Sequence, residues 1–217
     1  MANDNISHFA KARRINHINY RLKGSIPRSV LKQAREVRDK AIQAAIIDRG
    51  ELLSTQTAPT KQATLSTINA TYELRLDAYL DKGVYGPMHL RDSKVANIVI
   101  DALLNYHRSG EIFLYAVCVM SNHVHLVVGP TDDQESLDLA AFMRLHKGYT
   151  AYQVNKILGT TGIAFWERNY FDRVVRNGKF ATVMWYVLNN PVKAGLAADW
   201  RDWPHTWLNP DFNSLFR

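Results

Sequence analysis

Two histidines stand two residues apart in the segment His123-Val124-His125. The segment lies in an apolar, β-branched run, which predicts a strand, and side chains two residues apart on a strand point to the same face. Two imidazoles on one face can chelate a divalent cation, so the pair is a candidate metal site. Exposed or core histidines would give the same pattern, and a reaction would need a third ligand.

A tyrosine and a carboxamide one helical turn apart form the second candidate. Tyr186 and Asn190 lie at i and i+4 of a predicted helix that begins at about Phe180 and ends through Pro191 and Gly195. A phenol beside a carboxamide that could join two histidines on a metal is an active-site arrangement. By spacing alone, a core tyrosine and a helix-ending asparagine before proline is the simpler interpretation.

The elements that must position these residues predict an α+β fold. The expected strands are residues 15–22, 112–120, 123–128 and 171–176, the middle two forming a hairpin. Five helices are expected. The first follows Ser29, the second passes through Leu74 to Gly83, and the third runs from Asp92 or Ser93 to Tyr106. The fourth extends from the acidic segment 132–135 to about Leu158, and the fifth begins at about Phe180. This order suggests a ferredoxin-like antiparallel sheet with helices packed on it.

The length of 217 residues indicates a single domain, 1–217, with a helical insertion at about 28–83 after the first strand. Within it, residues 54–67 show no firm period and are the best linker candidate. The single cysteine, Cys118, excludes an internal disulfide framework and Cys-rich zinc modules. No apolar run is long enough for a membrane span and no signal-peptide pattern is seen, so a cytoplasmic protein is expected.

Positive charge is concentrated in one part of the chain. The net charge is +7, and residues 141–195 contain eight Lys and Arg against two acidic residues, interleaved with aromatic residues. This pattern fits single-stranded nucleic acid, where cations follow phosphates and rings stack on bases. A solvated helix face with core aromatics is an equal alternative; Tyr149 and Tyr152 are expected to pack, and Trp200, Trp203 and Trp207 to pin the C-terminal tail over the sheet.

Three strings in a fixed order resemble the REP-associated tyrosine transposases, members of the single-tyrosine HUH transposase superfamily. They are MSNHVHLVV (120–128), FWERNYFDRVVRN (165–177) and WYVLNNPVKAGL (185–196). YRLKGSIP (20–27) also resembles the first-strand motif of one subgroup. The resemblance covers about residues 15–207, except the part of the insertion near residues 50–70.

The resemblance implies a transposase-like, metal-dependent transesterase. It would cleave and rejoin single-stranded DNA at hairpin-forming, REP-like repeats through a covalent 5′-phosphotyrosine. Tyr186 matches the nucleophile, and His123, His125 and Asn190 match the ligands of Mg²⁺ or Mn²⁺. The DNA backbone would be held by Arg168, Arg173, Arg176, Lys179, Arg21 and Lys23. A monomer or a homodimer is expected.

Three other functions stay open at this point. The first is a catalytically silent DNA-binding regulator of the same fold, against which the intact His123, His125, Tyr186 and Asn190 argue. The second is a metallohydrolase that uses water as the nucleophile, for which Tyr186 would be dispensable. The third is an RNA-binding ferredoxin-like module, although its aromatic strand motifs are not evident.

Overall fold

The computed structural model describes residues 14–50 and 58–217, and the chain divides into two compact units. The helical unit is Gly24–Gly86. The sheet unit is formed by the chain up to Lys23 and by Pro87–Arg217. All of the candidate site residues lie in the sheet unit.

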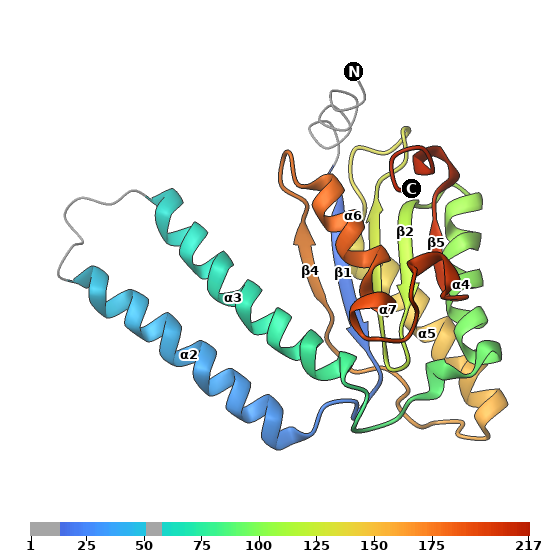
Figure 1. Cartoon of the computed structure of the whole chain (residues 1–217), viewed down its shortest axis with the longest axis horizontal. Coiled ribbons are helices and arrows are strands. Elements are labelled where there is room, and N and C mark those ends of the chain that lie inside the picture. Colours follow the sequence, from blue (N-terminus) through green and yellow to red (C-terminus); the bar gives the residue numbers. More distant parts are fainter. Residues whose placement is uncertain (1–13, 51–57) are drawn as a thin grey trace. The chain divides into compact units, whose positions relative to one another are not determined.

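The sheet unit is built on five antiparallel strands in the order β4-β1-β3-β2-β5 (Figure 1). Their bounds are β1 Asn16–Arg21, β2 Phe113–Val119, β3 His123–Gly129, β4 Phe171–Val174 and β5 Thr206–Leu208. The first four strands follow the 4-1-3-2 order of a ferredoxin-like sheet. The predicted α+β fold class and the β2–β3 hairpin are therefore confirmed.

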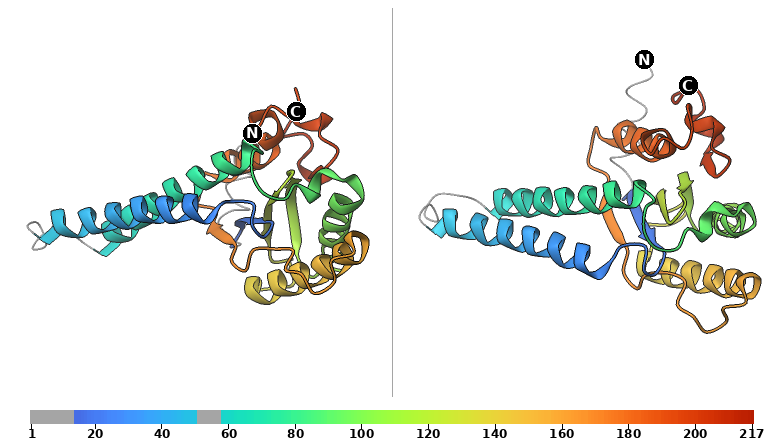
Figure 2. Two further views of the ribbon diagram at one scale, coloured as in Figure 1. Left: turned by 90° about the horizontal axis from the view of Figure 1, so that it is seen from below. Right: turned by 60° about the horizontal axis from the view of Figure 1, so that its bottom comes forward.

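Helices cover both faces of this sheet. On one side lie α4 (Ser93–Arg108) and α5 (Leu139–Leu158); on the other lie α6 (Phe180–Leu188), α7 (Asn190–Lys193) and the C-terminal tail (Figure 2). Strand alternation sends Val124 and Leu126 into the core beneath α4 and α5, as expected, while Val127 joins the core beneath α6. The odd-numbered residues of β3 therefore face α6.

The start of α5 differs from its prediction. The helix begins at Leu139 and not in the acidic segment 132–135, because Asp138 is its N-cap and accepts a hydrogen bond from the Ala141 amide at 3.0 Å. The acidic segment instead lies in a turn, where the Gln134 amide donates to the Thr131 carbonyl at 3.2 Å. Acidic residues are favourable near a helix N-terminus, but the acidic segment does not show which residue caps the helix.

The helical unit contains α2 (Arg28–Gly50) and α3 (Ala58–Asp81). Residues 58–67 are helical, so most of the predicted linker was wrong; residues 54–57 lie outside the described part of the chain. The many polar side chains of α3 hid the helical spacing of its apolar residues. The hydroxyls of Thr67 and Thr71 donate hydrogen bonds to backbone carbonyls one turn earlier, at 2.9 and 3.0 Å. None of the described helices is long and apolar enough to cross a bilayer.

The C-terminal tail adds a strand that periodicity did not predict. Short β5 pairs with β2 at the sheet edge, between the 3-10 turns Trp200–Asp202 and Pro210–Phe212; a third such turn, His89–Arg91, precedes α4. The Trp203 indole donates to the Val119 carbonyl at 2.9 Å. The expected pinning of the tail by its tryptophans is thus seen, but through strand pairing as well as packing.

Candidate active site

The two histidines of β3 lie on the face covered by α6. Both are buried, His123 at 1% and His125 at 0% exposure, and their ring centroids are 4.8 Å apart. Strand alternation puts them on one face, as the sequence predicted. Their burial was not predicted, because it depends on a helix that lies more than fifty residues later in the chain.

Hydrogen bonds determine which imidazole nitrogens can accept. His123 Nδ1 lies 2.7 Å from Asn122 Oδ1, which only accepts, so Nδ1 carries the proton and Nε2 the lone pair. His125 Nδ1 lies 3.3 Å from His17 Nε2, and His125 Nε2 is buried with no hydrogen-bond partner among the described residues. Burial, then the charges of His17 and Lys193, lower the pKa of His125 well below its ordinary value. His125 is therefore neutral, the state that metal ligation requires.

Helix α6 brings Tyr186 to this pair. The half-buried Tyr186 ring stands perpendicular to the ring of His125, with centroids 5.6 Å apart. It makes a second perpendicular contact, also at 5.6 Å, with His17. Lys193 Nζ lies 5.3 Å from the centre of the same phenol ring. A phenol, two imidazoles and an ammonium group thus meet on one face of the sheet.

Asn190 begins α7 and is fully buried. Its Nδ2 donates to the Tyr186 carbonyl at 2.8 Å and makes a longer contact with the Val187 carbonyl at 3.4 Å. Its Oδ1 is buried without a hydrogen-bond partner among the described residues, which costs about 1–3 kcal/mol unless something ligates it. The carboxamide is therefore anchored through nitrogen and presents an unused oxygen.

These donors fit a divalent cation. Asn190 Oδ1 and His125 Nε2 are buried atoms without a hydrogen-bond partner among the described residues, and His123 Nε2 has the tautomer that ligation needs. Within the described side chains, no three His, Cys, Asp or Glu residues could hold a metal ion together. A metal site here would therefore need a third ligand of another residue type, and the buried Asn190 Oδ1 is the candidate.

His17 belongs to this cluster and was missed by sequence reasoning. It lies on β1, two residues before Asn19, which pairs across the strands with His125. Its ring is nearly parallel to that of His125, at 5° and 5.5 Å, which suits a hydrogen bond between the ring nitrogens. The available signal was the alternation of polar residues 17, 19 and 21 in β1, but only the pairing of β1 with β3 gives it meaning.

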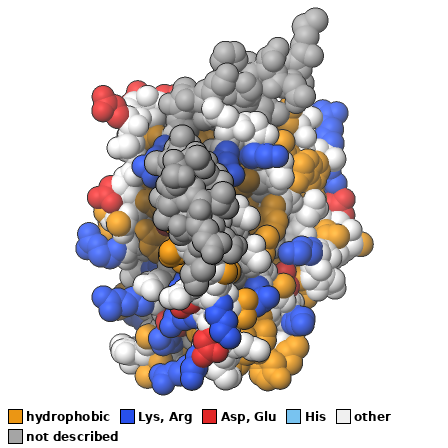
Figure 3. Space-filling view, turned by 90° about the vertical axis from the view of Figure 1, so that its left-hand side faces the viewer, with side chains coloured by type: hydrophobic (Ala, Val, Ile, Leu, Met, Phe, Trp, Pro, Cys, Tyr) orange, Lys and Arg blue, Asp and Glu red, His pale blue; other side chains and the backbone are white. Residues whose placement is uncertain are grey.

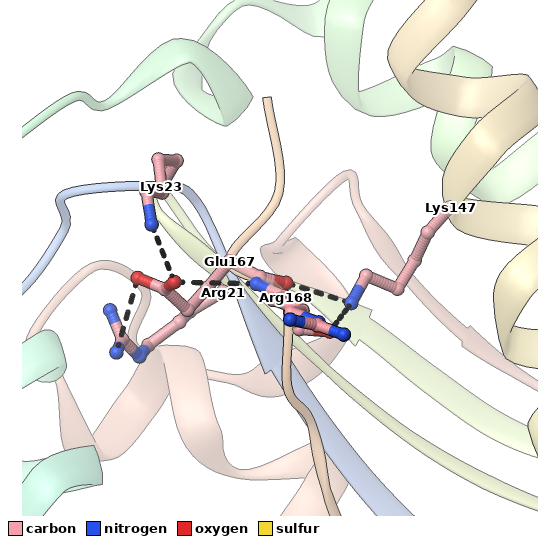
Figure 4. Close-up of polar contacts among 5 residues, drawn as sticks. All are labelled: Arg21, Lys23, Lys147, Glu167 and Arg168. Atoms are coloured by element: carbon pink, nitrogen blue, oxygen red, sulfur yellow. Dashed lines mark hydrogen bonds and ion pairs between the residues drawn. The ribbon is translucent and has the colours of Figure 1, made fainter. Parts of the chain in front are cut away.

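Two of the predicted DNA-binding residues are engaged with a carboxylate. Arg21 Nη2 lies 3.5 Å from Glu167 Oε2, and Lys23 Nζ lies 2.8 Å from Oε1 (Figure 4). Burial disfavours the charged form of Glu167, but the Lys23 hydrogen bond and the Arg21 charge outweigh it and lower the pKa of this carboxyl. Arg21 pairs across the strands with His123, so this ion-pair group adjoins the site.

The other predicted cations lie along the segment that leads to α6. Arg173 on edge strand β4 pairs with His17 and is half-buried. Arg168, Arg176 and Lys179 are exposed. On the face shown in Figure 3, basic side chains clearly outnumber acidic ones. The structure thus brings Arg21 and Arg173 next to the histidines, pairs Lys23 with Glu167, and leaves Arg168, Arg176 and Lys179 exposed.

Comparisons with known proteins agree with this arrangement. Residues 88–190 match the family model described as "Transposase IS200 like". A Haemophilus influenzae protein assigned to the REP-associated tyrosine transposases is 27% identical over 105 residues, covering 44% of this chain and 58% of that protein. The chain is similar to these transposases over this region. It spans less than two thirds of the Haemophilus protein.

A solved structure shares the fold of this chain. It is a REP-associated tyrosine transposase bound to a REP hairpin, and it matches 89% of this chain and 75% of its own with a TM-score of 0.50 and 13% identity. The family match includes His123, His125, Tyr186 and Asn190, since all four lie within residues 88–190. His17 and Arg21 lie outside it.

Proposed function

We propose that the chain is a metal-dependent transesterase that cleaves and rejoins single-stranded DNA at hairpin-forming repeats. The observation that carries the proposal is the contact of the Tyr186 phenol with the buried imidazole of His125, at 5.6 Å between ring centres. A nucleophile, candidate metal ligands and nearby cations are the groups that attack on a phosphodiester requires. The kinship with transposases supports DNA as the substrate.

His123, His125 and Asn190 would hold Mg²⁺ or Mn²⁺. When bound there, the ion would polarise the scissile phosphate and offset its negative charge. The protein's own contribution is to hold His125 in the neutral state and the carboxamide by its nitrogen. Because both imidazoles are buried, a phosphate would reach them only after side chains that cover them have moved.

Tyr186 would act as the nucleophile. A bond forms between Tyr186 Oη and phosphorus, the bond from phosphorus to the 3′ oxygen breaks, and the phenolic proton passes through solvent to that oxygen, which leaves as a 3′-hydroxyl. The DNA 5′ end stays attached to Tyr186, and attack by another 3′-hydroxyl reverses the step. The ordinary tyrosine pKa is about 10, so a nearby positive charge such as that of Lys193 assists loss of the proton.

Incubation with labelled single-stranded hairpin DNA and Mn²⁺ tests the proposal. We expect a protein–DNA adduct that survives denaturing electrophoresis, together with a fragment bearing a 3′-hydroxyl. Cleavage without an adduct would instead indicate a metallohydrolase that uses water. Binding without cleavage would indicate a catalytically silent regulator.

We expect His17 to position His125 through the 3.3 Å contact between their ring nitrogens. Replacing His17 with alanine should weaken Mn²⁺ binding about 10- to 100-fold, as is usual when a ligating histidine loses its outer partner. Isothermal titration calorimetry measures this without any activity assay. The His17→Gln variant, whose carboxamide can reach Nδ1, should recover part of the affinity; unchanged Mn²⁺ binding by His17→Ala would contradict the assignment.

Binding of single-stranded DNA should weaken steeply with salt. If about five phosphates are contacted, the logarithm of affinity should fall with the logarithm of salt concentration with a slope of about −3.5, since each contact releases counterions. Fluorescence anisotropy between 50 and 300 mM salt gives the slope. Replacing Arg176, which is exposed, with alanine should make it shallower by about 0.7. A flat profile would refute backbone binding by these cations.

A further inference from the structure

A groove of about 400 Å³ lies between α5 and residues 163–170. Helices α5 and α6 cover opposite faces of the sheet (Figure 2). The groove, which α5 lines, is therefore separate from the histidine cluster beneath α6. The two are joined along the chain by Glu167, which lines the groove and also pairs with Arg21, the cross-strand neighbour of His123. The ion pair of Glu167 with Arg21 therefore links the wall of the groove to the strand beside His123.

The groove is held open by hydrogen bonds from α5 to the opposite wall. Lys147 Nζ donates to the carbonyls of Glu167 at 2.8 Å and Arg168 at 2.9 Å (Figure 4). At the other end, Asn155 Nδ2 donates to the Ile163 carbonyl at 2.8 Å. A groove that is preformed in this way binds without first ordering its walls, which lowers the entropic cost of binding.

Its chemistry suits a nucleotide. Phe165 and Trp166, each 6% exposed, supply apolar surface, and Tyr170, whose ring centre is 5.8 Å from Lys147 Nζ, adds an aromatic ring. Flat apolar surface with aromatic rings accepts the face of any base.

The charges around the groove are positive. Arg144 and Arg168 are exposed lining residues, and neither guanidinium forms an ion pair with any residue of the described chain. The carboxylate of Glu167 is already engaged by Lys23 and Arg21. Free cations beside an apolar hollow complement phosphates on either side of an unpaired base.

Gly148 leaves room for this base. It faces the groove from α5, and a Cβ atom built on it would meet no atom within 4 Å. We propose that the groove binds one unpaired nucleotide of the DNA substrate, with its base beside Gly148 and Tyr170 and its phosphates on Arg144 and Arg168. This inference rests on the proposed function insofar as it takes DNA as the substrate.

Filling the groove tests the proposal. Gly148→Leu places a side chain in the hollow and, because glycine is a poor helix former, should not weaken α5. With fluorescein-labelled hairpins, we expect this variant to bind a hairpin with unpaired flanks about 10-fold or more weakly, which is the loss of one stacked base. A fully paired hairpin should bind within about twofold of the wild type. The exposed helical substitution Ala44→Leu is the matched control and should change neither affinity.

Arg144→Ala supplies a second test that leaves the hollow intact. It should weaken binding of the flanked hairpin and make the salt slope shallower by about 0.7. Wild-type affinity of Gly148→Leu for the flanked hairpin, or an equal loss for both hairpins, would overturn the nucleotide subsite. These measurements use the Tyr186→Phe background, so they are independent of whether cleavage occurs. At saturating DNA, the Gly148→Leu protein with Tyr186 should still form the adduct if the proposed function holds.

Discussion

Tyr186→Phe should abolish both strand cleavage and the covalent adduct while leaving the rest of the protein unchanged. The substitution removes one oxygen and keeps the ring that contacts His125 and His17. We expect cleavage to fall by at least about 10³-fold, as when a nucleophile is removed from other enzymes. DNA affinity should stay within about twofold, and stability within about 1 kcal/mol, the usual net value of one hydrogen bond.

The matched control is Tyr149→Phe. The sequence predicts that Tyr149 and Tyr152 pack, but Tyr149 is 49% and Tyr152 57% exposed on α5, so this prediction was wrong for both. Tyr149→Phe should cleave at the wild-type rate. Adduct formation by Tyr186→Phe, located by peptide mapping on another tyrosine, would transfer the role to that residue; cleavage without an adduct would point to water as the nucleophile.

The second large effect is expected from His125→Ala. Loss of a direct ligand should reduce Mn²⁺ affinity by more than the roughly 10- to 100-fold expected for loss of His17. Cleavage should then be undetectable. Because His125 is fully buried, its removal also leaves a cavity, so a loss of stability must be separated from a loss of metal binding. Calorimetry with Mn²⁺ and a thermal melt of the same sample make this separation.

His146→Ala is the control for burial. His146 is also fully buried, but it lies under the opposite face of the sheet, where its Nε2 lies 2.7 Å from the Tyr20 hydroxyl. Burial lowers the pKa of His146 to about 3, so it too is a neutral core imidazole. We expect His146→Ala to lower the melting temperature while keeping Mn²⁺ affinity. Equal loss of Mn²⁺ binding in both variants would remove the metal site from β3.

Local sequence determined the parts of the site that neighbouring residues encode. The alternation of a strand puts His123 and His125 on one face. A single helix was predicted to put Tyr186 and Asn190 on one side, but the structure ends α6 at Leu188 and begins α7 at Asn190. The strands and most helices were predictable for the same reason, because the spacing of apolar residues in each element is visible within a few neighbouring residues. The start of α5 was missed because one capping side chain, Asp138, decides it.

Only the tertiary structure decided how these pieces meet. Pairing of β1 with β3 brings His17 to His125 across 108 positions, and packing of α6 on that sheet face lays Tyr186 against the same imidazole. Burial of the histidines, the strand β5 and the groove beside Gly148 likewise arise from segments far apart in the chain. Such contacts follow from which hydrophobic faces pack together, and one segment's own periodicity carries no information about its partner.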